Sequence, residues 1–300
     1  MTNRNTPAFA RVLLLFPFLI TMTTPCVANE SRLNAMTQAF LSVHQIQGFD
    51  GSSGTIWFLF CPVDSQFRVP AFITARHVLD SIKSDSARLF LRKKTDSANY
   101  EVVPWTIQLR RNGRPFYKVH PDSSIDLAGM RTDLPSGIQF ELKNVGKSFL
   151  ATDRDFKNYE VHPGTHVIFV GYPLRLVSPR GNFPLARSGI IASYPLTPLR
   201  ENPRFYVDGP VFEGNSGSPV LLDEPLKVSS DGLEYGVVPL VLGIMTRSTR
   251  ITEEIHSFRE FAVKEHDIYL AEVVNSDYIL DFVDLLECSF YEAPSTDSLK

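Results

Sequence analysis

Three residues of this chain have the types that nucleophilic catalysis requires: Ser216, His77 and Asp126. A serine hydroxyl is a weak nucleophile at its own pKa, so it needs an adjacent base, and the base needs a group that orients it. Ser216 stands in Gly214-Asn215-Ser216-Gly217-Ser218-Pro219, between two apolar runs. Glycine neighbours let a substrate backbone come close and allow strained dihedral angles. The N–H groups of Gly214 and Ser216 would then point into one concavity, as an oxyanion hole requires.

The base and its acid each stand beside an apolar strand. Phe72-Ile73-Thr74 leads into Ala75-Arg76-His77, where the strand pattern gives way to a short helical turn. Asp126 directly precedes the apolar run Leu127-Ala128, and a carboxylate placed there is partly buried and needs a hydrogen-bond partner. We interpret the remaining histidines as capped or solvated: His44, His120, His162, His166, His256 and His266.

Strand signals dominate the elements that must position these residues. Thr55–Cys61, Val167–Pro173 and Val237–Thr246 are apolar runs bounded by turn residues, and many similar short runs lie between them. Short strands at close spacing with Gly/Pro turns predict an all-β barrel or sandwich. A helix is predicted over Asn275–Leu286, with Asn275 or Ser276 as its N-cap, and another over residues 31–46.

Residues 1–28 have the pattern of a secretory signal peptide. Arg4 and Arg11 give a basic start, Val12–Met22 is apolar, and Cys26-Val27-Ala28 places small residues where a signal peptidase reads. The apolar run is shorter than the roughly 20 residues that a membrane-spanning helix needs, and an uncleaved anchor is the alternative. We expect an exported protein, periplasmic or extracellular, without stable membrane insertion after cleavage.

Composition excludes some functional classes. Without Arg4 and Arg11 the chain has 28 basic and 33 acidic side chains, a net charge of −5. This charge does not suggest a nucleic-acid-binding protein, whose footprint is a basic patch. Two cysteines remain, Cys61 and Cys288, and they are too few for a disulfide framework. Whether they pair stays open, as does the oligomeric state.

The ordered set of motifs resembles the trypsin-like serine proteases of the chymotrypsin fold. His77, Asp126 and Ser216 follow that family's chain order, with separations of 49 and 90 residues. Further segments are similar to bacterial members, the HtrA-type proteases and the glutamyl endopeptidases: Gly51-Ser52-Ser53-Gly54-Thr55, Val170-Gly171-Tyr172-Pro173, Arg187-Ser188-Gly189-Ile190-Ile191-Ala192 and Leu242-Gly243-Ile244. The resemblance implies a secreted endopeptidase that needs no cofactor or metal and acts on polypeptides.

The same resemblance implies a fold and its boundaries. It predicts two six-stranded antiparallel β-barrels with a C-terminal α-helix. We expect an N-terminal segment at 29–45, a protease domain at 46–290 whose barrels divide near 140–160, and a flexible tail at 291–300. Whether residues 29–45 form a propeptide stays open. HtrA-type enzymes usually carry a PDZ domain after the protease, and we expect none here, since too few residues follow 290.

Departures from the family pattern bear on activation and specificity. Many animal relatives carry an aspartate at the position of Asn215, which pairs with the new N-terminus after activation cleavage, so we do not expect that activation here. Pro210 stands where trypsin has an acid, and Met245 where glutamyl endopeptidases have a histidine. We therefore predict an apolar or small P1 side chain, bound by a specificity pocket made of Pro210, Val211, Gly243, Ile244 and Met245.

Two other readings compete with an endopeptidase. An α/β-hydrolase esterase has a Gly-x-Ser-x-Gly elbow followed by a helix, with histidine last in the chain; here Ser218 replaces the last glycine and His77 comes first. A catalytically silent protein of this fold could instead bind peptides or a partner. A metal site is poorly supported, because Pro163 and Gly164 separate His162 from His166. We interpret Glu253, Glu254 and His256 as a solvated loop.

Overall fold

The computed structural model describes residues 36–62, 68–96, 99–135, 147–223, 226–229, 232–235, 240–256 and 261–287. The predicted signal peptide, residues 29–35 and the predicted tail lie outside this part of the chain, as do Cys288 and the side chain of Cys61. Export, cleavage and pairing of the two cysteines therefore stay predictions. No helix among the described residues combines the length and apolarity that crossing a membrane takes.

The first half of the chain forms a seven-stranded antiparallel sheet. Its order is β5-β4-β1-β2-β3-β9-β8. The strands are β1 (Val43–Gly48), β2 (Ser53–Pro62), β3 (Arg68–Thr74), β4 (Ser86–Lys94), β5 (Tyr100–Gln108), β8 (Lys118–Val119) and β9 (Ala128–Arg131). A two-stranded ribbon of β6 (Arg110–Arg111) and β7 (Arg114–Pro115) follows β5. The sheet encloses its own core, in which Phe58, Phe72 and Leu89 are fully buried.

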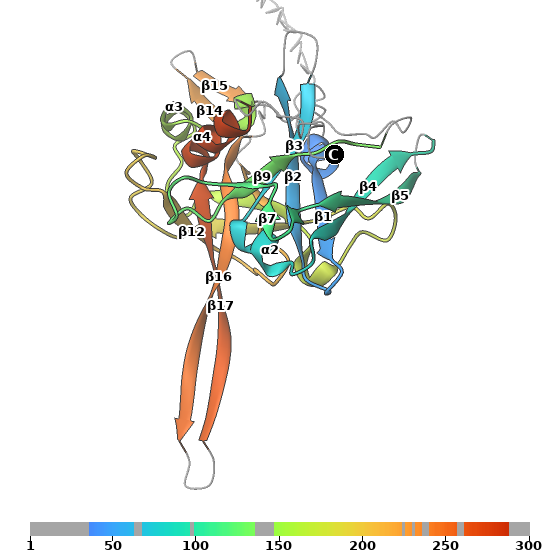
Figure 1. Ribbon diagram of the computed structural model, residues 1–300. Helices are drawn as coiled ribbons and strands as arrows, with labels where there is room; N and C mark the ends of the chain where they lie inside the picture. The colour runs from blue at the N-terminus through green and yellow to red at the C-terminus, as the bar shows by residue number, and fades with distance from the viewer. Residues whose placement is uncertain are drawn as a thin grey trace, which may run out of the picture.

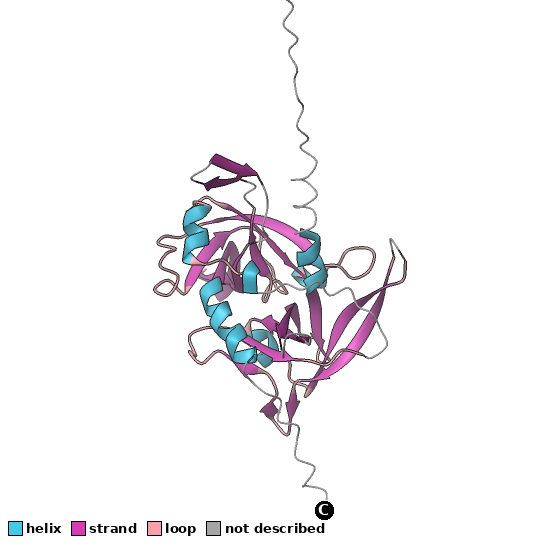
Figure 2. Ribbon diagram, turned by 90° about the horizontal axis from the view of Figure 1, so that it is seen from above, coloured by secondary structure: helices cyan, strands magenta, loops and turns pink. Residues whose placement is uncertain are grey.

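The second half closes into a six-stranded barrel of order β10-β11-β12-β17-β16-β13. Its strands are β10 (His166–Gly171), β11 (Leu185–Ile191), β12 (Arg204–Asp208), β13 (Pro219–Leu222), β16 (Val241–His256) and β17 (Phe261–Asn275). The ribbon of β14 (Leu226–Ser229) and β15 (Gly232–Tyr235) stands apart from the barrel sheet. Seen from above, the strands form two groups side by side (Figure 2). The predicted all-β architecture is confirmed; within the described residues the first unit is a seven-stranded sheet where a six-stranded barrel was predicted.

Helices cover the junction and the flanks. They are α2 (Arg76–Ser81), α3 (Asp153–Asn158) and α4 (Ser276–Glu287), with short 3-10 turns at Lys147–Phe149 and Pro173–Arg175. Asn275 caps α4, because its Oδ1 accepts the N–H of Asp277 at 3.0 Å. The apolar face of α4 enters a core that both units share, and Phe282 belongs to this core together with Trp57 and Val170. The predicted C-terminal helix is thus confirmed and joins the two sheets.

Two elements differ from the sequence predictions. The helix at the start of the described chain ends at Ser42 and does not reach Ile46, because β1 begins at Val43 and pairs with both β2 and β4. Beyond the barrel, β16 and β17 continue as a two-stranded arm that projects from the body (Figure 1). Glu253, Glu254 and His256 lie on β16 in this arm, so the prediction that they form a loop is wrong. Cross-strand pairing with β17 overrides their polar character.

A buried arginine ties the N-terminal helix to both units. Arg92 on β4 is 1% exposed and donates hydrogen bonds to the carbonyl groups of Phe40, Leu41 and Val43. It also donates to the hydroxyl of Tyr172, which follows β10, at 3.0 Å. Arg92 therefore satisfies carbonyl groups at the end of the helix, which otherwise have no intrahelical partner.

His44 completes this buried cluster. Its Nδ1 lies 3.0 Å from the carbonyl oxygen of Phe90, and its Nε2 lies 3.1 Å from both an Arg92 nitrogen and the carbonyl oxygen of Leu41. Burial, followed by the charge of Arg92, holds the pKa of His44 well below its usual range, although its backbone hydrogen bonds act in the opposite direction. His44 is therefore neutral in the folded protein.

Candidate active site

The end of β3 and the start of β9 bring His77 and Asp126 together. His77 lies in the first turn of α2, two residues after the short break at Ala75 that follows β3. Its Nδ1 lies 2.7 Å from Oδ2 of Asp126, and its backbone N–H donates to Oδ1 of the same carboxylate at 3.0 Å. The two bonds fix both the ring and the backbone. The histidine side chain is 49% exposed and the aspartate 19%, so the ring faces solvent while the acid is shielded.

The surroundings keep Asp126 ionised. Burial by itself raises the pKa of its carboxyl group, but the hydrogen bonds and charge of His77 lower it, and so does the charge of Arg247. The net effect places the pKa of Asp126 below its usual range. An ionised carboxylate accepts the Nδ1 proton of His77, which leaves Nε2 without a proton and able to accept one.

Ser216 lies on the other side of the imidazole ring. It belongs to the loop between β12 and β13, and its Oγ lies 3.0 Å from Nε2 of His77. The same Oγ lies 3.1 Å from the carbonyl oxygen of Thr246 on β16. A hydroxyl has one proton, so it donates to one of these acceptors at a time. The three predicted catalytic side chains are thus within hydrogen-bond reach of one another in the order Asp126, His77, Ser216.

Backbone strain around Ser216 explains its glycine neighbours. Gly214 and Gly217 have φ angles of +94° and +93°, a region that L side chains rarely adopt. A Cβ on Gly214 would lie 2.3 Å from the carbonyl oxygen of Tyr172, and one on Gly217 would lie 1.9 Å from that of Thr55. The loop therefore requires glycine at both positions for two independent reasons.

Thr55 on β2 holds the serine loop from the other unit. Its hydroxyl donates to the carbonyl of Gly214 at 2.8 Å, and its backbone N–H donates to the carbonyl of Ser216 at 3.0 Å. The C=O and N–H of one peptide point in opposite directions. Because Leu174 N–H donates to the carbonyl of Glu213 at 2.7 Å, the N–H of Gly214 points away from Leu174.

Both predicted oxyanion donors are free in the described part of the chain. Neither the N–H of Gly214 nor that of Ser216 donates a hydrogen bond to another described residue. Asn215 between them is 1% exposed, and its amide nitrogen and oxygen have no hydrogen-bond partner among the described residues. The loop therefore presents two unused donors beside the serine hydroxyl and carries no charge of its own at position 215.

A depression of about 280 Å³ opens at these side chains. Of the predicted pocket residues, Val211 and Met245 line it, together with His77, Gly214 and Ser216. Pro210 and Gly243 are not among its lining residues, and Ile244 is fully buried in the shared core. Sequence reasoning missed other lining residues, which are Ser53, Val78, Ser81, Phe212, Glu213, Thr246, Arg247, Ser248 and Arg250. Thr246, Arg247, Ser248 and Arg250 follow Met245 on strand β16. This continuity with a predicted pocket residue was the sequence signal that could have identified them.

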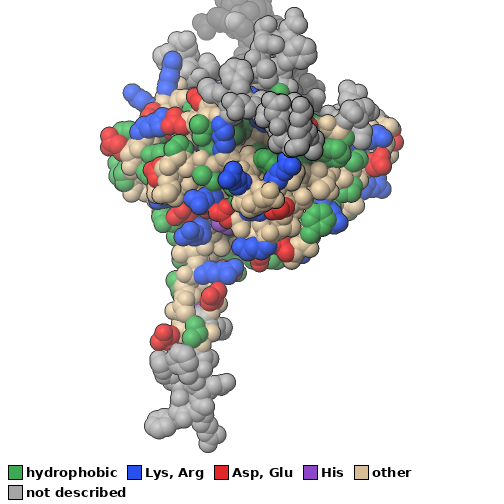
Figure 3. Space-filling model, in the orientation of Figure 1, with side chains coloured by type: hydrophobic (Ala, Val, Ile, Leu, Met, Phe, Trp, Pro, Cys, Tyr) green, Lys and Arg blue, Asp and Glu red, His purple; other side chains and the backbone are tan. Residues whose placement is uncertain are grey.

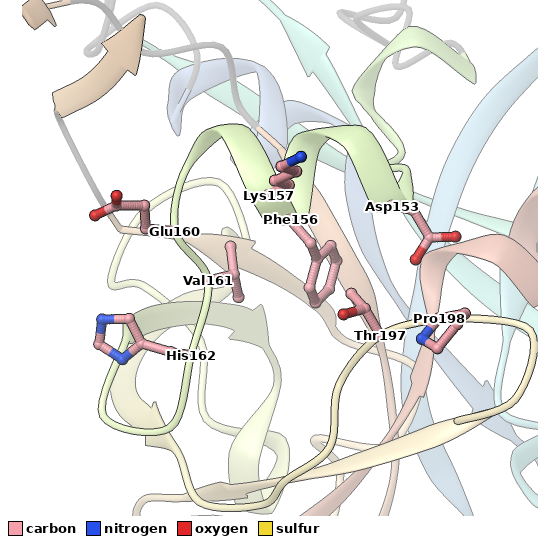
Figure 4. Close-up of a pocket in the computed structure, with 8 residues that line it drawn as sticks. All are labelled: Asp153, Phe156, Lys157, Glu160, Val161, His162, Thr197 and Pro198. Carbon is pink, nitrogen blue, oxygen red and sulfur yellow. The ribbon is translucent and has the colours of Figure 1, made fainter.

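A larger depression of about 600 Å³ lies between α3 and the loop at Thr197-Pro198 (Figure 4). Phe156 and Val161 form its apolar part, and Glu160 and His162 stand at one side. None of its lining residues belongs to the triad, and none is placed to activate a nucleophile. Among the described residues, no group of three or more His, Cys, Asp or Glu side chains is arranged to hold a metal ion.

The architecture, a closed six-stranded barrel with a second antiparallel sheet and a C-terminal helix, is consistent with the double barrel of the chymotrypsin fold. No protein-family model and no curated protein matches the chain. Solved structures that it resembles include the human heparin binding protein, at 12% identity over 86% of this chain and 96% of that one, with a TM-score of 0.49.

Two further solved structures resemble the chain. The inactive form of the Rv3671c protease is 15% identical over 88% of this chain and 96% of that one, with a TM-score of 0.42. Deg5 is 16% identical over 87% and 95%, with a TM-score of 0.49. The chemistry of the site is therefore argued from its own atoms.

Proposed function

We propose that this protein is a serine endopeptidase that cleaves polypeptides through an acyl-enzyme intermediate. The observation that carries the proposal is the hydrogen-bonded line from Asp126 through His77 to Ser216, with distances of 2.7 and 3.0 Å. His77 would take the Ser216 proton as Oγ attacks the scissile carbonyl carbon, and would later give it to the leaving amine. Asp126 would hold the imidazole and stabilise its charged form.

The two free N–H groups of Gly214 and Ser216 would stabilise the tetrahedral oxyanion. Such donors act strongly because they are oriented before the reaction begins, and loss of one typically lowers kcat by about a hundred- to a thousandfold. Here Thr55 and Leu174 fix the loop in advance. Hydrolysis of the acyl-enzyme by water would repeat the same proton transfers and regenerate the serine.

The specificity that the depression supports is an apolar or small P1 side chain. Val211 and Met245, which are both buried, line the depression close to Ser216. Three charged residues also line the depression, and their side chains are exposed to solvent: Glu213, Arg247 and Arg250. A peptide-library cleavage profile tests this, and dominance of charged P1 residues would contradict it.

Labelling with a fluorophosphonate probe tests the catalytic proposal directly. We expect the purified protein to be labelled at Ser216, and Ser216→Ala and His77→Ala to lose the label. Ser218→Ala is the matched control, because Ser218 is a fully buried serine of the same loop whose hydroxyl has no hydrogen-bond partner among the described residues. Absence of labelling in a folded protein would favour the silent peptide-binding alternative.

We also propose that the protein is exported. The support is the sequence pattern of residues 1–28, with a basic start, an apolar run and small residues before Asn29. Amino-terminal sequencing of the protein recovered from its native host tests this proposal. A mature chain that begins at Asn29 is expected, and a chain that still contains residues 1–28 would contradict it.

A further inference from the structure

Arg92 is the only buried arginine or lysine among the residues whose burial the structure describes. Basic and acidic side chains are interspersed on the surface that Figure 3 shows. The hydrogen bonds of Arg92 run to backbone carbonyl groups, to His44 and to the hydroxyl of Tyr172, and not to a carboxylate. A buried charge is costly unless hydrogen bonds satisfy it, so these partners hold fixed positions around the guanidinium.

Tyr172 is held at both of its ends. Its hydroxyl accepts from Arg92 at 3.0 Å and lies 2.9 Å from the carbonyl oxygen of Asn182 and 3.3 Å from that of Val43. Burial raises the pKa of this hydroxyl against the opposing charge of Arg92, so the group keeps its proton and can donate. The backbone N–H of Tyr172 donates to the hydroxyl of Thr55 at 3.1 Å. The buried ring therefore joins Arg92 to Thr55.

The hydroxyl of Thr55 continues this link to the serine loop. It accepts from the N–H of Tyr172 and donates to the carbonyl of Gly214 at 2.8 Å. That carbonyl belongs to the peptide after Gly214, and Leu174 fixes the peptide before it through the carbonyl of Glu213. Because each peptide is planar, the two bonds set the direction of the Gly214 N–H. Tyr172 and Leu174 together therefore orient one of the two oxyanion donors.

The backbone after Tyr172 needs such an anchor. Leu174 and Arg175 have φ angles of +50° and +63°, which residues other than glycine adopt only where the surrounding structure imposes them. The side chain of Leu174 is 57% exposed, so its own packing does not impose this conformation. The N–H of Arg175 donates to the carbonyl of Tyr172 at 3.1 Å. The fixed position of Tyr172 thus supports the turn that brings Leu174 to the serine loop.

We propose that Arg92 and Tyr172 are positioning residues of the serine loop, through which the docked N-terminal helix holds the N–H of Gly214 in place. The inference rests on the proposed function. The helix contributes the carbonyl groups of Phe40 and Leu41, to which Arg92 donates at 2.9 and 3.2 Å. Undocking of the helix would free Arg92 and Tyr172 and loosen the donor, while His77 and Ser216 stay in place.

The expected effect lies on the transition state rather than on substrate binding. The oxyanion forms only after Oγ of Ser216 has attacked, so a loosened Gly214 N–H weakens a bond that the bound substrate does not yet make. Such a change lowers kcat and leaves KM nearly unchanged. A general loss of stability would instead lower the amount of folded enzyme.

Removing single hydroxyl groups tests the link by kinetics. Tyr172→Phe removes the contact with Arg92 and keeps the ring, and Thr55→Val removes the contacts with Gly214 and Tyr172 with little change in shape. We expect each variant to lower kcat by about tenfold with little change in KM. Thr55→Ser, which keeps a hydroxyl, should recover most of the loss. If Thr55→Ser is as slow as Thr55→Val, or if only KM changes, the proposal is wrong.

The double variant of Tyr172→Phe and Thr55→Val shows whether the two groups act in series. Its kcat should lie within about twofold of the slower single variant, whereas independent effects would multiply to about a hundredfold loss and contradict the link. Phe156→Leu is the stability control, because Phe156 belongs to the barrel core and not to this path. Its kcat per folded molecule should stay within about twofold of the native value. A tenfold loss there would assign the effect to stability and overturn the proposal.

Hydrogen exchange in Ser216→Ala separates this inference from the proposed function. The N–H groups of Asn215, Gly217 and Ser218 are hydrogen-bonded within or beside the serine loop, so their exchange reports its opening. Adding Tyr172→Phe should speed their exchange by about tenfold and leave the barrel strands unchanged. Arg92→Met should speed exchange in both the N-terminal helix and the serine loop. Unchanged exchange in the loop would overturn the inference whether or not the serine is reactive, and faster exchange would support it even if the fluorophosphonate probe does not label the protein.

Discussion

Nδ1 of His77 lies 2.7 Å from Oδ2 of Asp126, a residue 49 positions further along the chain. The bond selects the imidazole tautomer whose Nε2 faces Ser216 as an acceptor. In Asp126→Asn an amide N–H can face Nδ1 and favour the other tautomer, so we expect kcat to fall by about 10⁴ with little change in KM. Steady-state kinetics and the melting temperature check this, and a loss of less than about tenfold in a folded variant would refute the role of Asp126.

Gly214→Ala should strongly lower activity, because the added methyl group would displace the serine loop. The new Cβ would lie 2.3 Å from the carbonyl oxygen of Tyr172, so the loop would have to shift and would move one oxyanion donor. We expect a loss of kcat of about a hundredfold or more. Gly164→Ala is the matched control, since Gly164 has a φ of +95° but a Cβ added there would meet no atom within 4 Å. If both variants lose activity equally, dihedral strain rather than the clash is responsible.

Arg92→Met should destabilise the fold more than any surface substitution on the same strand. It removes the hydrogen bonds from Arg92 to the carbonyl groups of Phe40, Leu41 and Val43, of which Val43 keeps the Tyr172 hydroxyl at 3.3 Å, and a buried acceptor left without a donor costs about 1–3 kcal/mol. We expect the free energy of unfolding to fall by ~3 kcal/mol or more in urea denaturation. Lys93→Ala, the neighbouring half-exposed position, should change it by less than about 0.5 kcal/mol.

His44 should make the protein sensitive to mild acid. The unfolded chain binds a proton at His44 as pH falls through about 6.5, whereas the folded chain holds this residue neutral to a much lower pH. The unfolded state then carries more protons, so the free energy of unfolding decreases as pH falls below 6.5, by up to ~1.4 kcal/mol per pH unit. His44→Gln keeps a donor and an acceptor but does not titrate, so urea midpoints measured across this range should show a smaller slope for the variant. An unchanged slope would mean that another group is responsible.

The sequence predicts the parts of the fold that depend on local pattern. Apolar strands with Gly/Pro turns and the stripe of residues 275–286 are local signals, and both are confirmed. The long hairpin of β16 and β17 is not predicted, because polar and charged residues interrupt the apolar ones along both strands. Its strand structure depends on pairing between residues such as Glu254 and Val263, and hydrophobic periodicity does not report such pairing.

For the candidate site too, the sequence predicts some features and not others. Residue types, glycine neighbours and chain order predict which side chains meet, since each stands at the end of an apolar strand. The roles of Thr55 and Leu174 in holding the serine loop could not be predicted, because they depend on contacts between segments 159 and 39 residues apart. Arg247 and Arg250 were missed because the predicted strand was ended at Thr246, where apolar residues give way to charged ones.

The hydrogen bonds from Thr55 to the serine loop hold the two halves of the chain together at the candidate active site. His77 and Asp126 come from the first half of the chain, Ser216 follows β12 of the barrel, and Thr55 on β2 bonds to the serine loop. Each half expressed by itself would be inert, and reassociation of the two fragments would restore turnover. Under the proposed function, hydrolysis would therefore report the docking of the two halves and would decline as soon as they separate, before either sheet unfolds.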